Sequence, residues 1–116
     1  MQNVIIAFDS KQLTLILEKM LGSFGFDTTK AENTEQIRVL LKKGSKILLL
    51  SDWNLAGQSM IDFLSRIENK PTTIFISKEN SPEKIITALQ NGIDEYIIKP
   101  FDNDILQSKL SMVGLL

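Results

Sequence analysis

The sequence contains neither cysteine nor histidine among its 116 residues. Thiolate nucleophiles, imidazole bases and zinc sites built from these side chains are therefore excluded. Any metal ion has to be bound through oxygen atoms. An excess of basic residues is also lacking, because 13 Lys and Arg are scattered among 14 Asp and Glu. Nucleic-acid binding usually requires clustered basic side chains, so we expect no nucleic-acid partner.

Long apolar runs are missing as well. A membrane-spanning helix needs about 20 mostly apolar residues in a row, and a signal peptide begins with a basic region followed by a long apolar run. The sequence has neither pattern, so we predict a cytoplasmic protein with no membrane partner. Its composition, 43% hydrophobic and 23% charged, is typical of a soluble globular chain. The length suits one compact domain, which we expect to span residues 1–116.

Short apolar segments rich in Ile, Leu and Phe recur along the chain, and they are too short for helices. This pattern predicts buried strands at residues 3–7, 46–50, 72–76 and 95–98. A weaker candidate at residues 27–31 contains Thr28 and Thr29 but few apolar side chains. We therefore expect that strand at an edge of the sheet.

Apolar residues with helical spacing lie between the predicted strands. The clearest buried face comprises Leu13, Ile16, Leu17, Met20, Leu21 and Phe24. Shorter faces comprise Ile37, Leu40 and Leu41, then Met60, Phe63, Leu64 and Ile67, and finally Leu106, Leu110 and Val113. Side chains suited to capping helix N-termini are Ser10, Asn33, Ser81 and Asp102. Pro82 suits a first helical turn, and Gly44 and Gly92 suit helix ends.

Five strands that alternate with five helices predict a parallel α/β sheet with helices on both faces. In such a sheet, functional groups lie just beyond the carboxyl ends of the strands. The predicted strand ends bring together carboxylates (Asp9 and Asp52), a hydroxyl (Ser77) and an ammonium group (Lys99). This set suits phosphoryl transfer to an aspartate with a magnesium ion bound nearby.

Three segments resemble the motifs of the response-regulator receiver domains, the CheY-like family, and the resemblance extends over essentially the whole chain. They are LSDWNL at residues 50–55, IS at 76–77 and YIIKPF at 96–101. The resemblance implies that Asp52 is the phosphoacceptor, Ser77 the switch hydroxyl, Lys99 the phosphoryl contact and Tyr96 the rotameric reporter. It also implies a cis Lys99–Pro100 bond. The implied fold is a flavodoxin-like, doubly wound five-stranded parallel sheet of strand order 2-1-3-4-5.

The chain departs from the family pattern after the first strand, where receivers usually have two adjacent acidic residues. Here Phe8 precedes Asp9. The remaining ligands that the resemblance implies for Mg²⁺ are Asp9, Asp52 and the main-chain carbonyl of Asn54, and we expect weakened binding. Two further departures are Ala56, where proline is common, and Met60, where glycine is common, so a different loop shape is expected.

The leading functional interpretation is a receiver in a two-component phosphorelay. It would accept a phosphoryl group on Asp52 from a histidine kinase or phosphotransfer protein and switch a surface that binds an unidentified downstream protein. Such a receiver is a non-enzymatic switch, although it assists its own phosphotransfer and dephosphorylation. The alternative is a pseudo-receiver that signals by binding without phosphorylation, which Phe8 favours. An aspartate-nucleophile phosphatase ranks last, because Asn54 stands where that class has a second acid.

Simpler interpretations of the same residues also exist. Asp52 could cap a turn, and Asp9 could cap the helix that follows it. Lys99 could be a solvated lysine, since its long stem reaches water from almost any strand end. Tyr96 and Phe8 could serve packing alone. Only the combination of these residues favours the phosphorelay interpretation.

Overall fold

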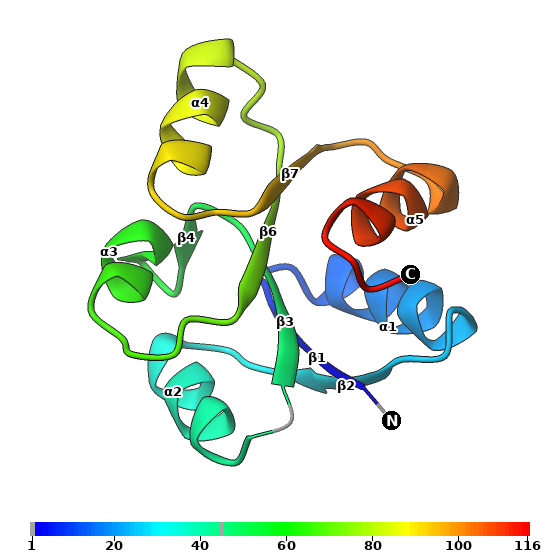
Figure 1. Ribbon diagram of the computed structural model, residues 1–116, viewed down its shortest axis with the longest axis horizontal. Coiled ribbons are helices and arrows are strands. Elements are labelled where there is room, and N and C mark those ends of the chain that lie inside the picture. The colour runs from blue at the N-terminus through cyan, green and yellow to red at the C-terminus, as the bar shows by residue number, and fades with distance from the viewer. Residues whose placement is uncertain (1, 45) are drawn as a thin grey trace.

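The computed structural model describes residues 2–44 and 46–116 of the chain. A five-stranded parallel sheet has the order β2-β1-β3-β6-β7 (Figure 1). The strands are β1 Asn3–Ala7, β2 Asp27–Lys30, β3 Lys46–Ser51, β6 Thr72–Ser77 and β7 Glu95–Ile98. Counted along the chain within this sheet, the order is 2-1-3-4-5. The predicted flavodoxin-like topology is confirmed, and the weak strand β2 lies at the sheet edge.

Five helices connect these strands: α1 Lys11–Ser23, α2 Thr34–Lys42, α3 Met60–Ser65, α4 Pro82–Gln90 and α5 Asn103–Met112. The predicted caps of α1, α2, α4 and α5 are confirmed, because each capping side chain accepts a hydrogen bond from a main-chain N–H of the first turn. These bonds satisfy N–H groups that have no partner within the helix. Among the described residues, no helix has the length and apolar character to span a bilayer.

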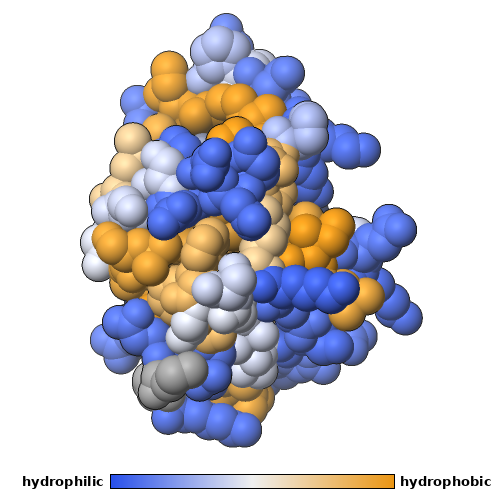
Figure 2. All heavy atoms as spheres, turned by 90° about the vertical axis from the view of Figure 1, so that its right-hand side faces the viewer, coloured by the Kyte–Doolittle hydropathy of each residue, from blue (hydrophilic) through white to orange (hydrophobic). Residues whose placement is uncertain are grey.

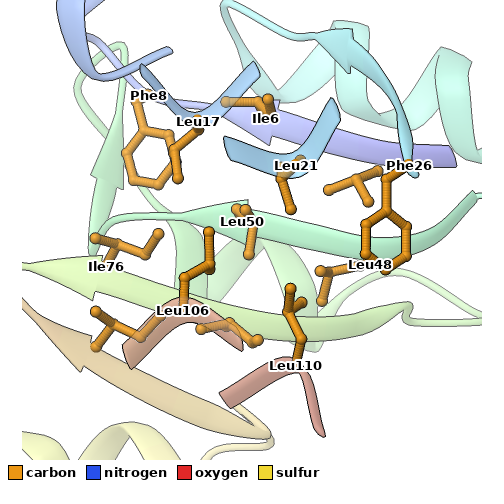
Figure 3. Packing of buried hydrophobic residues seen from close by; sticks show 13 residues of the cluster. Ile6, Phe8, Leu17, Leu21, Phe26, Leu48, Leu50, Ile76, Leu106 and Leu110 are labelled. Carbon is orange, nitrogen blue, oxygen red and sulfur yellow. The ribbon is translucent and has the colours of Figure 1, made fainter. Parts of the chain in front are cut away.

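The helices cover both faces of the sheet, with α1 and α5 on one side and α2, α3 and α4 on the other (Figure 1). Alternation along the strands supplies both apolar cores, because successive side chains of a strand point to opposite faces. In β3, Leu50 packs with Leu17 and Leu106 on the α1/α5 side (Figure 3). The neighbouring Leu49 belongs to the core beneath α2, α3 and α4, together with Phe75.

Several sequence-based boundaries were wrong. Ile16 is 51% exposed, although it was assigned to the buried face of α1. The buried side chains of that helix are Thr14, Leu17 and Leu21, which form one stripe along it. Ile16 lies outside this stripe, on the part of the helix surface that faces solvent. Helix α3 ends at Ser65, so Ile67 packs against the core from the following loop. Strands β3 and β6 each extend one residue beyond the prediction, and β2 ends one residue earlier.

A short antiparallel hairpin, β4 Asn54–Leu55 with β5 Gln58–Ser59, follows β3 and was not predicted. On the side of α1 and α5, apolar surface patches are separated by hydrophilic side chains (Figure 2). The exposed apolar residues of these two helices are Leu15, Ile16, Ile105 and Met112.

Candidate functional site

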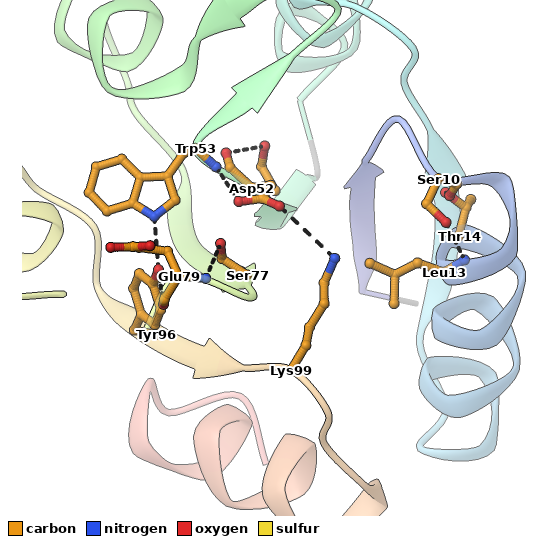
Figure 4. A network of polar contacts seen from close by, with 10 residues as sticks. Ser10, Leu13, Thr14, Asp52, Trp53, Ser77, Glu79, Tyr96 and Lys99 are labelled. Atoms are coloured by element: carbon orange, nitrogen blue, oxygen red, sulfur yellow. Dashed lines mark hydrogen bonds and ion pairs between the residues drawn. The ribbon is translucent and has the colours of Figure 1, made fainter. Parts of the chain in front are cut away.

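Asp52 lies at the carboxyl edge of the sheet, immediately after β3 (Figure 4). Its Oδ1 atom accepts a hydrogen bond of 2.6 Å from the main-chain N–H of Trp53. The other oxygen, Oδ2, lies 4.0 Å from the Lys99 ammonium. Both side chains remain partly accessible, with 33% exposure for Asp52 and 23% for Lys99. The carboxylate is therefore oriented by one neighbour while a cation faces its second oxygen.

Lys99 directly follows β7, and its backbone is tied to the adjacent strand. Its main-chain N–H donates to the Ser77 carbonyl at 2.9 Å. The Lys99–Pro100 peptide bond is cis, which confirms that prediction. The Lys99 ammonium also lies 5.9 Å from the ring centroid of Phe8, within the range of a cation–π contact. Lys99 is thus placed between an aromatic ring and the carboxylate of Asp52.

Phe8 follows β1 and is only 7% exposed, within the core on the α1/α5 side (Figure 3). It contributes apolar packing together with the contact to Lys99. The position next to Asp9 consequently carries no negative charge, and its ring fills the space beside the lysine.

Asp9 is exposed, and its Oδ1 accepts a hydrogen bond of 3.0 Å from the main-chain N–H of Ala56. This contact joins the loop after β1 to the β4–β5 hairpin. Ala56 has a φ of 49° and Gly57 a φ of 78°, so both hairpin residues adopt left-handed conformations. That conformation costs a residue with a Cβ atom about 1 to 2 kcal/mol. The carboxylate of Asp9 stabilises the unusual loop that Ala56 creates.

The oxygen donors at this edge suit a magnesium ion that keeps several of its waters. They do not suit a metal that is enclosed by protein ligands. Residues 2–44 and 46–116 contain no cluster of three or more acidic side chains that would surround a metal. Mg²⁺ commonly keeps several waters and is held by one or two carboxylates. Asp9 and Asp52 can supply two, and Asn54 begins β4 two residues after Asp52.

Ser77 ends β6 and is 4% exposed. Its hydroxyl oxygen accepts a hydrogen bond of 3.1 Å from the main-chain N–H of Glu79. The side chain therefore stabilises the turn after β6 as an acceptor, and its O–H proton can still donate to a new partner. The structure places Ser77 on the same edge as Asp52 and Lys99 (Figure 4).

Tyr96 lies in β7 and is 5% exposed, with its hydroxyl group pointing into the molecule. That hydroxyl donates to the Glu79 carbonyl at 2.8 Å and accepts from the Trp53 indole N–H at 2.8 Å (Figure 4). The ring of Tyr96 is therefore already buried, and both hydrogen-bonding functions of its hydroxyl are used. Sequence reasoning assigned no role to Trp53 or Glu79. Trp53 was adjacent to Asp52, but no sequence signal indicated Glu79.

Together, these residues provide a carboxylate that is oriented, partly accessible and faced by a lysine ammonium group. Such an arrangement can attack an electrophilic phosphorus atom while the ammonium balances the charge that develops on the phosphoryl oxygens. The two candidate switch residues, Ser77 and Tyr96, lie on the opposite side of Asp52 from Ser10, the residue that follows Asp9 (Figure 4).

Comparison with known proteins agrees with this geometry. Residues 4–111 match the family model described as "Response regulator receiver domain". The chemotaxis protein CheY-3 of Vibrio cholerae is 31% identical over 116 residues, covering 95% of this chain and 89% of that protein. CheY of Pseudomonas aeruginosa is 27% identical, covering 95% of this chain and 94% of its own.

Solved structures show the same fold. A two-component response regulator from Clostridium difficile superposes with a TM-score of 0.86 at 22% identity, covering 97% of this chain and 96% of that one. The chemotaxis response regulator CheY4 of Vibrio cholerae gives 0.85 at 21% identity, with 97% and 98% covered.

Proposed function

The chain belongs to the response regulator receiver family, and from this premise we propose that Asp52 accepts a phosphoryl group from a partner protein. Membership supports a role in two-component signalling. The donor would be a phosphohistidine on a histidine kinase or phosphotransfer protein, since this chain contains no histidine. The observation that carries the proposal is the position of Lys99, whose ammonium faces Asp52 Oδ2.

The two oxygens of Asp52 have different surroundings, and this suggests which of them reacts. Trp53 occupies Oδ1 with a hydrogen bond, while Oδ2 faces Lys99. We assign nucleophilic attack to Oδ2. A bond forms between Oδ2 and phosphorus as the bond between phosphorus and the donor nitrogen breaks, which leaves an acyl phosphate on Asp52. The ammonium of Lys99 then offers a charge-assisted hydrogen bond to a phosphoryl oxygen.

We propose Asp9, Asp52 and the main-chain carbonyl of Asn54 as the residues that hold Mg²⁺. A bound magnesium ion would offset the charge on the phosphoryl oxygens. The chain's own contribution is to hold Asp9 beside the hairpin through its bond to Ala56. Phe8 removes one negative charge and one acceptor for a metal-bound water, so the proposed affinity is lower than with a complete acidic pair.

The signal would leave through Ser77 and the surface formed by α4, β7 and α5, within which Tyr96 is already buried. Phosphorylation places a new acceptor near the Ser77 hydroxyl, whose O–H can donate a charge-assisted hydrogen bond to it while the oxygen accepts from the Glu79 N–H. The surface carries exposed apolar side chains suited to a protein target: Ile86, Leu89, Ile98 and Ile105.

A pseudo-receiver remains the second candidate, and a specific observation favours it. Phe8 is buried beside Lys99, where receivers usually have an acidic residue. In that case the same surface would bind its target without phosphorylation. The phosphatase interpretation has no comparable support, because the second acid of that class is replaced by the exposed Asn54.

Intact-mass measurement after incubation with acetyl phosphate and Mg²⁺ tests the proposal. The parent chain should gain the mass of one phosphoryl group, and Asp52→Asn should gain none. Asparagine is a matched control, because it retains the shape of the side chain and an oxygen that accepts from Trp53. An equal gain in both proteins would refute Asp52 as the acceptor. No gain in either, at millimolar Mg²⁺, would favour the pseudo-receiver.

A further inference from the structure

Trp53 contacts both the proposed phosphoacceptor and the tyrosine of the output surface. Its main-chain N–H donates to Asp52 Oδ1 at 2.6 Å. Its indole N–H donates to the Tyr96 hydroxyl at 2.8 Å, across 43 positions of sequence (Figure 4). One residue therefore connects the end of β3 with the side chain in β7 through two separate donors.

The surroundings of Tyr96 show how firmly its hydroxyl is held. It accepts from Trp53 and donates to the Glu79 carbonyl, so both hydrogen-bonding functions are used. Phe75 packs against both rings, with centroids 5.3 Å from Trp53 and 6.3 Å from Tyr96. Rotation of Tyr96 to the surface would break two hydrogen bonds and separate this aromatic group.

We propose that Trp53 is a positioning residue that holds Tyr96 inward before Asp52 carries a phosphoryl group. In the resting protein, the α4–β7–α5 surface then has the arrangement in which Tyr96 is buried. The burial of Tyr96 does not depend on phosphorylation while the indole donor is present. The importance of this Trp53–Tyr96 contact for signalling rests on the proposed receiver function. The contact itself does not.

A phosphoryl group on Oδ2 leaves Oδ1 as the carbonyl oxygen of an acyl phosphate, which still accepts from the Trp53 main-chain N–H. The backbone that positions the indole is therefore kept in both states. The Ser77 hydroxyl can donate to a phosphoryl oxygen without displacing Tyr96, because it accepts from the Glu79 N–H whereas Tyr96 donates to the Glu79 carbonyl. The chain separates the group that senses phosphorylation from the group that fixes the tyrosine.

Nitration by tetranitromethane measures this hold, because Tyr96 is the chain's one tyrosine and Trp53 its one tryptophan. The parent should react slowly, at the same rate with and without beryllofluoride and Mg²⁺. Trp53→Phe keeps an aromatic ring but lacks the indole donor, and its nitration should be about three- to tenfold faster. Lys84→Gln is the matched control, since it removes a cation 5.7 Å from the Trp53 ring and leaves the donor intact. Its rate should equal that of the parent.

Equal nitration of Trp53→Phe and the parent would overturn the proposal, as would a parent whose tyrosine becomes protected only with beryllofluoride. If Trp53→Phe does not fold, Tyr96→Phe provides the second measurement. The Trp53 indole proton should exchange with solvent about three- to tenfold faster in Tyr96→Phe than in the parent. Unchanged exchange would overturn the hold. Neither measurement requires phosphorylation, so failure of Asp52 to react would refute the receiver function and leave this test intact.

Discussion

The two sides of Asp52 differ in how completely their polar groups are bonded. On one side, the hydroxyls of Ser77 and Tyr96 are buried and engaged in hydrogen bonds. On the other side, the carboxylate of Asp9 is exposed and accepts from Ala56, and Phe8 contributes a ring in place of a second acid. On the side of Ser77 and Tyr96, here called the tyrosine side, the fold itself forms these hydrogen bonds. The Asp9 side is the more exposed of the two, and it is where we propose that a cation binds.

The largest effect should come from Lys99, which stands between the two sides. Lys99→Gln removes the cation that faces Asp52, and the rate of phosphorylation by acetyl phosphate should fall about 100-fold. Lys78→Gln is a matched control, since Lys78 is an exposed lysine after the neighbouring strand. Rates are measured by intact mass against time. An equal fall in both variants would show that Lys99 contributes only general positive charge.

Phe8→Asp should make the Asp9 side more like a complete acidic pair. We expect Mg²⁺ to bind about 10 to 100-fold more tightly, because the new carboxylate adds charge and an acceptor for a metal-bound water. The affinity is measured from Trp53 fluorescence. The metal-free variant should be less stable than the parent, since a buried aromatic ring is replaced by a carboxylate close to Asp9.

Phe8→Asn distinguishes two effects of Phe8→Asp, namely the added negative charge and the space that loss of the ring opens. It opens a similar space and supplies a polar group without a negative charge. If Phe8→Asp binds Mg²⁺ no more tightly than Phe8→Asn and the parent, the contribution of charge at residue 8 is refuted.

The fold was largely predictable from the sequence, whereas the tyrosine side of the site was not. Apolar runs located four strands of the main sheet, Thr28 and Thr29 indicated the fifth, and four helix N-caps followed from local chemistry. The rule that carboxyl ends of parallel strands share one edge brought Asp52 and Lys99 together. Strand order required the family resemblance, because periodicity does not specify which strands are neighbours.

The remaining features depend on contacts that no local pattern encodes. The bond between Trp53 and Tyr96 joins residues 43 positions apart and depends on the final placement of two rings. The hairpin β4–β5 depends on a left-handed Ala56, which is an unusual conformation for alanine. A pattern typical of one helix face also could not show that Ile16 lies outside the buried stripe of α1.

Tyr96→Phe should weaken the tyrosine side. The variant loses both hydroxyl bonds and leaves the Trp53 indole N–H and the Glu79 carbonyl without this partner. The free energy of unfolding should fall by about 1 to 3 kcal/mol, as measured by urea denaturation. Mg²⁺ affinity should remain that of the parent, because the Tyr96 hydroxyl bonds Trp53 and Glu79 and none of the proposed metal ligands. A large loss of Mg²⁺ affinity would contradict the separation of the two sides.

The smallest effect is expected for Ser77→Ala. This variant removes one hydrogen bond to the Glu79 N–H, so the free energy of unfolding should fall by about 0.5 to 1.5 kcal/mol. Nitration of Tyr96 should stay as slow as in the parent, since the Trp53 donor is intact. Rapid nitration would show that Ser77, and not Trp53, holds the tyrosine.

The central claim, that Asp52 is the phosphoacceptor, is tested most directly by chemical trapping. The parent chain is incubated with acetyl phosphate and Mg²⁺ and then treated with borohydride, which reduces an acyl phosphate to an alcohol. Peptide mapping by mass spectrometry identifies the converted residue. We predict conversion at residue 52 alone, with Asp9 unchanged. Conversion at another acidic residue, or no conversion under conditions that phosphorylate a complete receiver, would contradict the claim.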